Sequence, residues 1–536
     1  MVPPRSSEEP RGAEGSLGRE IKSETERKGG IEMNRRKSGS VRAWSLCALA
    51  VWVALCLSDT AIAKTWTGSH TEKWHEDKWE RKTAPTEMEK AFISSYYPIV
   101  NVERTGNVAA ELLFARSTWE EGIVNLDVNI MEGALLTIGA PGKPARIADY
   151  STSGYSPRIK CAINSIGSGS GVLRFNKAST YAQVDISDYI LSLTLGHVEV
   201  PDMAGTDGVS QSGPVILQGP IRAIGGAEPW KIDRGSLTVG RAEYIDAAAP
   251  DILRLWLDGL DDKGEAVLNI TDNVELKNAM LAVGAKGQAV LEVADGKVLT
   301  LTKAGQLVNR LNASNAVVVK RGKGALALAG DGIFHGGDPY SDLKVMKVDQ
   351  GLLHVKGSAF ASLSAPVKIS VAKGTAVTFE RLNEKHDVSL EFSPGAAISL
   401  DMTGATATSP ALQVAELSGD VTLDLKNTAG ISGRVAVIRT DNISGLKSVF
   451  LLGAGAEKFD RRIEGNTVFI VGKGGGDPAP DPTPNPEPQP SPGPKPTPKP
   501  NPRTDKDKSG GGCDAGLSGT AGLVLLLAAS LLLRRR

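Results

Sequence analysis

A short unit recurs along this chain: a glycine followed by a run in which apolar and polar side chains alternate. The units begin at Gly133, Gly171, Gly235, Gly296, Gly324, Gly351, Gly374, Gly395 and Gly419. Alternation with a period of two between turn-forming residues is typical of short β-strands, because successive side chains of a strand point to opposite faces. The chain is therefore predicted to consist of many short strands, each preceded by a turn.

The spacing of these units indicates how the strands assemble. From Gly324 the units begin 27, 23, 21 and 24 residues apart, and similarity at periods of roughly 20 to 50 residues marks stacked repeats. A strand of five residues cannot bury its apolar face alone, but strands stacked about 4.8 Å apart cover one another. The sequence predicts an all-β fold in which residues 101–473 form a right-handed parallel β-helix, or β-solenoid. Tandem β-sandwich modules are the alternative, since they also show short alternating strands.

The stretch Val317–Gly357 carries a longer pattern of this kind. A Lys-x-Gly-x-Gly segment leads into an apolar alternation, a glycine-rich turn and a second alternation of the form Gly-x-Leu-x-Val. The pattern falls on Lys320, Gly322, Gly324, Leu326, Leu328, Gly330, Gly336, Gly351, Leu353 and Val355. It resembles the strand repeat associated with autotransporter passengers. The resemblance covers only about forty residues, so the architecture of the remaining body is inferred from spacing.

Charge and cysteine content limit the function classes. The chain has 61 Lys and Arg and 61 Asp and Glu residues, and phosphate binding requires a concentrated basic face. We therefore expect no nucleic-acid partner. The cysteines are Cys47, Cys56, Cys161 and Cys513, too few in the exported part for a disulfide framework. Cys161 is expected to be a small buried hydrophobic residue.

The N-terminal region has the layout of an export signal. Residues 1–32 are polar and are predicted to be a non-native extension, with translation beginning at Met33. Residues 33–63 combine a basic start, an apolar run and the small-residue sequence Ala61-Ile62-Ala63, which is typical of a secretory signal peptide. Cleavage is predicted after Ala63, so that the mature chain starts near Lys64.

Two segments stand out from the repeats. Residues 64–100 contain Trp66, Trp74 and Trp79 and are predicted to form a cap over the first open strand layer, as stacked folds require. A platform of aromatic rings that binds sugars is the alternative. Residues 247–260 are predicted to form a helical turn or a projecting loop that offers a contact surface, with Trp256 itself expected to pack.

The segment that follows the body, residues 474–509, is rich in proline. Thirteen prolines occupy every second position from Pro478 to Pro502, a pattern that favours extended polyproline II structure. At about 3.1 Å per residue, this part would form a semi-rigid stalk of roughly 75 to 80 Å.

Residues 510–536 end the chain with a glycine cluster, a cysteine and an apolar run. Ala515–Leu533 is long enough to cross a bilayer as a helix, and the three arginines after it would stay cytoplasmic. The arrangement resembles a Synergistes-type C-terminal sorting signal, whose motif falls on Gly511, Gly512, Cys513, Asp514, Ala515 and Gly516. Asp514 stands where asparagine is more usual. The resemblance implies that a membrane protease cuts near Cys513 and that the thiol carries the new attachment; a plain membrane anchor is the alternative.

No catalytic, cofactor or metal site is predicted. Asp258, Asp261 and Asp262 form an acidic group, but the segment lacks the pattern of a calcium loop. Apart from His70 and His75, whose spacing is taken as incidental, the histidines lack metal-ligand spacing, and no serine lies in a nucleophile elbow. We expect a non-catalytic protein on the cell surface with a structural or adhesive role. Its expected partners are the membrane, a sorting protease and the glycans or proteins of a host or neighbouring cell. A carbohydrate-active enzyme on the same scaffold is the alternative.

Cys513→Ala tests the resemblance at the C-terminus. If the thiol carries the attachment, the variant is expected to be lost from the cell envelope into the medium, as measured by immunoblotting of the two fractions. A variant that stays as firmly attached as the wild-type chain would contradict this route and favour the plain anchor.

Overall fold

The computed structural model describes residues 63–473 except for short internal gaps. The gaps are residues 68–70, 77, 94–98, 116–122, 150–157, 168–170, 187–189, 202–207, 225–228, 246–252, 259–263, 285–287, 311–315, 381–384 and 454. The predicted extension (1–32), almost all of the predicted signal peptide (33–63), the proline-rich segment from residue 474 and the sorting signal (510–536) lie outside the described residues.

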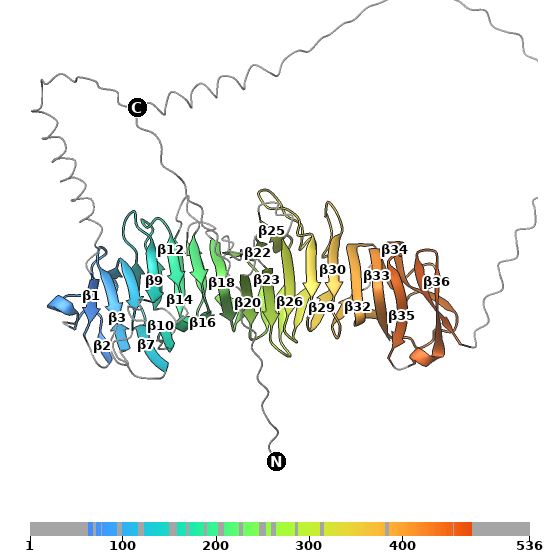
Figure 1. Ribbon diagram of the computed structural model, residues 1–536, viewed down its shortest axis with the longest axis horizontal. Coiled ribbons are helices and arrows are strands. Elements are labelled where there is room, and N and C mark those ends of the chain that lie inside the picture. The colour runs from blue at the N-terminus through green and yellow to red at the C-terminus, as the bar shows by residue number, and fades with distance from the viewer. Residues whose placement is uncertain are drawn as a thin grey trace, which may run out of the picture. The chain divides into compact units, whose positions relative to one another are not determined.

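The body is a parallel β-solenoid, in which each turn of the chain supplies up to three segments that lie against the matching segments of the next turn. Figure 1 shows the strands of successive turns side by side along the body. We number the three faces by the order in which the chain passes through them. The first face consists of β1 (Ala63–Trp66), β3 (Lys90–Ile93), β6 (Glu111–Phe114), β9 (Ala145–Asp149), β12 (Ala182–Asp185), β15 (Val209–Ser212), the first half of β18 (Pro229–Val239), β19 (Leu253–Leu257), β22 (Ala279–Val283) and β25 (Leu307–Asn309).

The second face is the longest and runs through the whole described body. It consists of β2 (Thr71–Lys73), β4 (Ile99–Val102), β7 (Ile123–Ile130), β10 (Arg158–Ser165), β13 (Ile190–Leu195), β16 (Val215–Leu217), the second half of β18, β20 (Glu265–Ile270), β23 (Gln288–Val293), β26 (Val317–Arg321), β28 (Val345–Val348), β30 (Val367–Val371), the first halves of β32 (His386–Asp401) and β33 (Leu412–Lys426), and β34 (Arg434–Asn442).

The third face is interrupted once. Its first part is a five-stranded sheet of β5 (Asn107–Ala109), β8 (Leu135–Ile138), β11 (Val172–Phe175), β14 (His197–Pro201) and β17 (Ile221–Ile224). The next turn has the short 3-10 helix η2 (Ala242–Tyr244) at this place. Strands resume with β21 (Val274–Leu276), β24 (Val298–Leu301), β27 (Ala325–Leu328), β29 (Leu352–Val355), β31 (Ala376–Phe379), the second halves of β32 and β33, and β35 (Leu446–Leu452).

The last strands change direction. β36 (Phe459–Glu464) and β37 (Thr467–Gly472) form an antiparallel hairpin, and β37 also pairs antiparallel with β34. Two further 3-10 helices, η1 (Glu80–Lys82) and η3 (Ala456–Lys458), lie near the two ends of the described body. The hairpin covers the edge of β34, which would otherwise be open to pairing with another chain.

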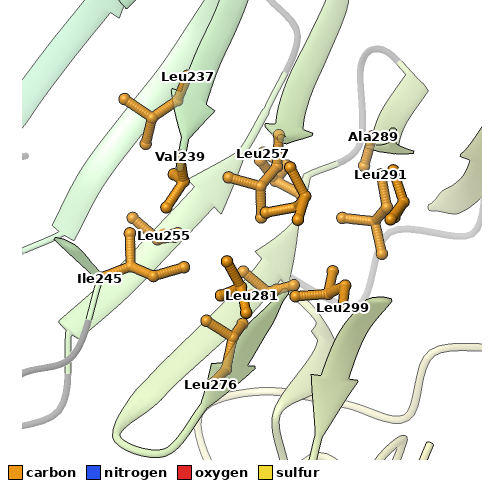
Figure 2. Packing of buried hydrophobic residues seen from close by; sticks show 14 of the residues in the cluster. Leu237, Val239, Ile245, Leu255, Leu257, Leu276, Leu281, Ala289, Leu291 and Leu299 are labelled. Carbon is orange, nitrogen blue, oxygen red and sulfur yellow. The ribbon is translucent and has the colours of Figure 1, made fainter. Parts of the chain in front are cut away.

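The core consists of columns of apolar side chains, one from each turn. On the third face one column runs through Leu299, Leu326, Leu353, Val377 and Ile398, all fully buried. Figure 2 shows side chains of the three faces meeting in the interior, among them Leu281, Leu291 and Leu299. Burial of one such side chain stabilises the fold by about 1.5 to 3 kcal/mol, so each turn depends on its neighbours.

The predicted strand units are confirmed, and they pair parallel as the solenoid interpretation requires. The sandwich alternative does not fit, because its strands would pair antiparallel within each module. Two expectations were wrong. Leu253–Leu257 is strand β19 of the first face rather than a helical turn or loop, because its alternating leucines point into the core and are buried. The final strand, β37, belongs to the antiparallel hairpin and not to the parallel stack.

The unit glycines lie at the corners of the turns. Gly133, Gly235, Gly296, Gly351, Gly374, Gly395 and Gly419 have positive φ, the backbone region that side chains with a Cβ rarely adopt. The other two, Gly171 and Gly324, leave no room for a Cβ, because it would run into the backbone carbonyl of the preceding turn. The glycine content is therefore required by the turning of the chain.

Gly374 and Gly419 separate two effects of a corner glycine. Both have positive φ (+76° and +86°), but a Cβ at Gly374 would meet no atom within 4 Å, whereas at Gly419 it would overlap the carbonyl oxygen of Phe392. Gly374→Ala should cost about 1 to 2 kcal/mol through backbone strain. Gly419→Ala should cost about 1 to 3 kcal/mol more, because the two turns must separate. Urea unfolding of the full-length variants measures both, and equal losses would contradict the assignment.

Candidate functional site

Lys320, the first residue of the Lys-x-Gly-x-Gly segment, lies in the core. In the parallel register it stands between Leu291 and Val348 in an interior column, and it is fully buried. Lysine is almost never fully buried without partners. Its ammonium donates three hydrogen bonds at the corner, to the carbonyl oxygens of Arg321 (2.8 Å), Gly322 (2.7 Å) and Gln350 (3.0 Å).

The glycines of the segment make room for this ammonium. A Cβ on Gly351 would lie 2.8 Å from Nζ of Lys320, and would also overlap the carbonyl oxygens of Gly322 and Gly324. Burial lowers the pKa of Lys320 to about 8, so the ammonium is still protonated at pH 7 and can donate to all three carbonyls. The segment that carries the resemblance is thus a corner that joins one turn to the next.

Buried side-chain amides also bind backbone carbonyl groups at other corners. Nε2 of Gln211 donates to the carbonyl oxygens of Gly213 (2.6 Å) and Ser236 (2.8 Å), and its Oε1 accepts a hydrogen bond from the indole of Trp230 (2.9 Å). Gln306 likewise bonds backbone groups of its own turn and of the preceding one. These buried polar side chains satisfy backbone groups and are not free for a ligand.

The insert that follows β27 is held by Asp342. Its carboxylate accepts hydrogen bonds from the backbone N–H of Gly336 (3.0 Å), from the N–H and hydroxyl of Ser364 (2.8 and 2.7 Å), and lies 3.1 Å from Nδ1 of His335. Although burial alone would raise the pKa of Asp342, the hydrogen bonds from Ser364, Gly336 and His335 lower it. This carboxylate organises a loop and is not available as an acid or base.

The three N-terminal tryptophans are buried in the first turn. Trp66, Trp74 and Trp79 are each at most 1% exposed. Trp79 makes edge contacts with both other rings, and its indole N–H donates to the carbonyl of Trp74 (2.6 Å). A platform that stacks sugars needs an exposed ring face, so this alternative is wrong for these three residues.

The strongest cluster of ionisable groups lies on the outer side of the first face. Asp258 forms ion pairs with Arg310 and with Lys231 (3.8 Å), and Lys231 also lies 3.3 Å from Asp233. The guanidinium of Arg310 lies 3.4 Å from the ring centre of Trp256. Four charged groups from neighbouring turns therefore converge beside one half-buried indole.

The charges of this first-face cluster largely neutralise one another. The side chains of Lys231, Asp233, Asp258 and Arg310 are between 10% and 17% exposed. Burial raises the pKa of Asp233, and the opposing effect of Lys231 is smaller. Asp258 comes from the predicted acidic group, whereas Asp261 and Asp262 lie outside the described residues. The cluster is the arrangement in the described body that comes nearest to a catalytic carboxylate site.

Other charged side chains pair between neighbouring turns. Such pairs are Lys64 with Glu89, Lys90 with Glu111, Arg146 with Asp185, Arg174 with Glu199, Lys297 with Asp272, and Lys368 with Glu391. Sequence reasoning missed these pairs. Their signal is present in the sequence as opposite charges about one turn apart, for example the separation of 25 residues between Arg174 and Glu199.

The predicted processing residues are only partly described. Ala63 is the first residue of β1 and is exposed, while Lys64 is buried and pairs with Glu89 (2.9 Å). Ala61 and residues 511–516 lie outside the described residues, as does the predicted span 515–533. No helix in the described part of the chain is long and apolar enough to cross a membrane.

The same part of the chain contains no group of three His, Cys, Asp or Glu side chains that could hold a metal ion. Cys161 is buried and unpaired, as expected, and burial raises the pKa of its thiol. Comparison with protein-family models, with curated proteins and with solved structures gives no match for this chain.

Lys320→Met tests the corner assignment through pH. Because the folded pKa of about 8 lies below the ordinary value of 10.5, the unfolded chain holds the proton more tightly between these values. Raising the pH therefore favours the folded wild type, and this contribution is lost as the pH falls through 8. Relative to the variant, wild type should gain about 3 kcal/mol between pH 7 and 10.5.

The measurement is urea unfolding of both full-length chains across this pH range. Lys347→Met is the matched control, since Lys347 is exposed on the outer side of the same face in the next turn. The assignment of Lys320 would be contradicted if the difference in free energy of unfolding between wild type and Lys320→Met stayed constant with pH. It would also be contradicted if the difference for Lys347→Met changed with pH by the same amount.

Proposed function

We propose that this chain is an exported, non-catalytic surface protein with a structural or adhesive role. In this proposal the described body is a right-handed β-solenoid. Residues 474–509 are a polyproline stalk, and residues 510–536 are a sorting signal with a membrane-spanning helix. The membrane and a sorting protease are its partners at the C-terminal end. Surface glycans or proteins of a host or neighbouring cell are its partners along the body.

The main support is the use that the described body makes of its ionisable groups. Buried ones such as Lys320 and Asp342 bind backbone groups at corners and loops, and outer ones pair from turn to turn, as Arg174 does with Glu199. Exposed ion pairs of this kind contribute about 0 to 1 kcal/mol each, so their value lies in fixing the register of neighbouring turns. A scaffold with its charges committed in this way suits a role in display and contact.

The first-face cluster favours a second candidate, a carbohydrate-active enzyme. Glycoside hydrolysis uses two carboxylates, one of them with a raised pKa, and Asp233 and Asp258 fit that description in part. Against this, Asp258 is bound by Arg310 and Lys231, and both carboxylates are largely shielded from solvent. A substrate would have to displace an ion pair to reach them, so we favour the non-catalytic role.

Two measurements on the full-length chain test this choice. Added protease should degrade the body on intact cells that display the chain, because the body lies outside. The purified chain should release no reducing ends or unsaturated sugars from a panel of polysaccharides. Sugar release would favour the carbohydrate-active enzyme if Asp258→Asn abolished it and the control Asp295→Asn, at an exposed turn, left it unchanged. Protection of the body from protease would contradict the surface location.

A further inference from the structure

The break in the third face leaves a hollow at the corner between the second and third faces. β17 is the last strand of the five-stranded sheet, and in the described residues no strand pairs with its far edge. The next turn supplies η2 instead. The hollow has a volume of about 710 Å³ and is lined from four successive turns, including Val172, His197, Arg222 and Tyr244.

The hollow offers one guanidinium group that forms no ion pair with the described residues. Arg222 is on the outer side of β17, exposed, and has no ion-pair partner among the described residues. Its register neighbour Glu199 is bound by Arg174 instead, through bonds of 2.8 and 2.5 Å. Arg222 is therefore available to an anionic ligand.

A second guanidinium comes from the following turn. Arg241 lies 3.7 Å from Glu243, but the two side chains are 67% and 63% exposed, and such a pair is weak. A carboxylate that reaches both arginines would gain a bidentate contact of the kind that guanidinium groups form best. The amide of Gln218 and the phenol of Tyr244 line the same hollow and supply hydrogen bonds for hydroxyl groups.

The dimensions favour a chain over a single small anion. Four turns about 4.8 Å apart extend along the solenoid for roughly 15 Å. A second hollow of about 500 Å³, on the later part of the third face, is less suited to an anion. There the carboxylates of Glu380 and Asp401 line the hollow, and Lys426 is already paired with Asp424.

We propose that the hollow beside β17 and η2 binds acidic polysaccharide, with Arg222 and Arg241 on the carboxylate or sulfate groups and Gln218 and Tyr244 on sugar hydroxyls. This rests on the proposed adhesive function and names the class of its ligand. A nucleic acid fits less well, because only two arginines are among the described residues that line the hollow, together with the acidic Glu243, and Tyr244 and His197 are the only aromatic side chains among them.

The test measures binding of oligogalacturonate to the full-length chain by calorimetry. Wild type should bind it, and should bind the fully methyl-esterified oligomer at least tenfold more weakly. The double variant Arg222→Ala/Arg241→Ala should weaken oligogalacturonate binding at least tenfold. Arg222→Lys should fall between, because lysine keeps the charge and loses the bidentate geometry. A sulfated galactan arm shows whether sulfate is preferred to carboxylate through the same arginines.

Arg234→Ala is the matched control. Arg234 is an exposed arginine on β18, in the same turn as Arg241, and it does not line the hollow. The Arg234→Ala variant should therefore bind oligogalacturonate within twofold of wild type. Equal binding of the methyl-esterified oligomer, equal losses in the Arg234 control, or tighter arginine-dependent binding of single-stranded DNA would overturn the proposal. These outcomes leave surface display untouched, so failure of the hollow is distinguishable from failure of the proposed function.

Discussion

The contact between one turn and the next is the interaction on which everything else in this body depends. No single turn can bury its apolar side. The strand that carries Leu326, β27, has only four residues, and Leu326 is buried because Leu299 of the preceding turn and Leu353 of the next turn pack against it. The same parallel register that aligns these leucines also aligns the backbone hydrogen bonds. Stability is therefore shared between neighbours, and a defect at one interface should be felt mainly by the two turns that meet there.

In this arrangement the backbone groups that lack hydrogen-bond partners in a neighbouring strand lie at the corners. A chain that must turn repeatedly leaves backbone groups without strand partners, and burying them unsatisfied costs free energy. The chain meets this need in two ways: glycines allow positive φ or close approach, as at Gly351, and buried polar side chains bind the remaining groups, as Lys320 and Gln211 do. Burying the charged ammonium of Lys320 costs free energy, and the same loss of solvation lowers the pKa of Lys320. The ammonium is tolerated because three carbonyls share it.

How far the sequence predicts this structure follows from the range of each interaction. Strands such as β27 and β31 were predictable because alternation is local, and the corner glycines because Gly351 or Gly419 recurs at the period of one turn. The role of Lys320 was not, because the alternation around it does not show that a lysine replaces a leucine in an interior column. Trp256 and Arg310 were also out of reach, since their contact joins residues two turns apart through folding alone.

The break in the third face shows how the same constraint makes room for binding. Where β11 and β14 stack, the backbone and alternating side chains fill the layer, and outer charges pair along the column, as Arg174 and Glu199 do. Replacing the next strand by η2 ends that column at Arg222, whose register neighbour Glu199 is already bound by Arg174. The core is not disturbed, because Ile245 still fills the interior place of that turn and is fully buried. A solenoid can thus gain a charged hollow by omitting one strand while keeping its apolar columns intact.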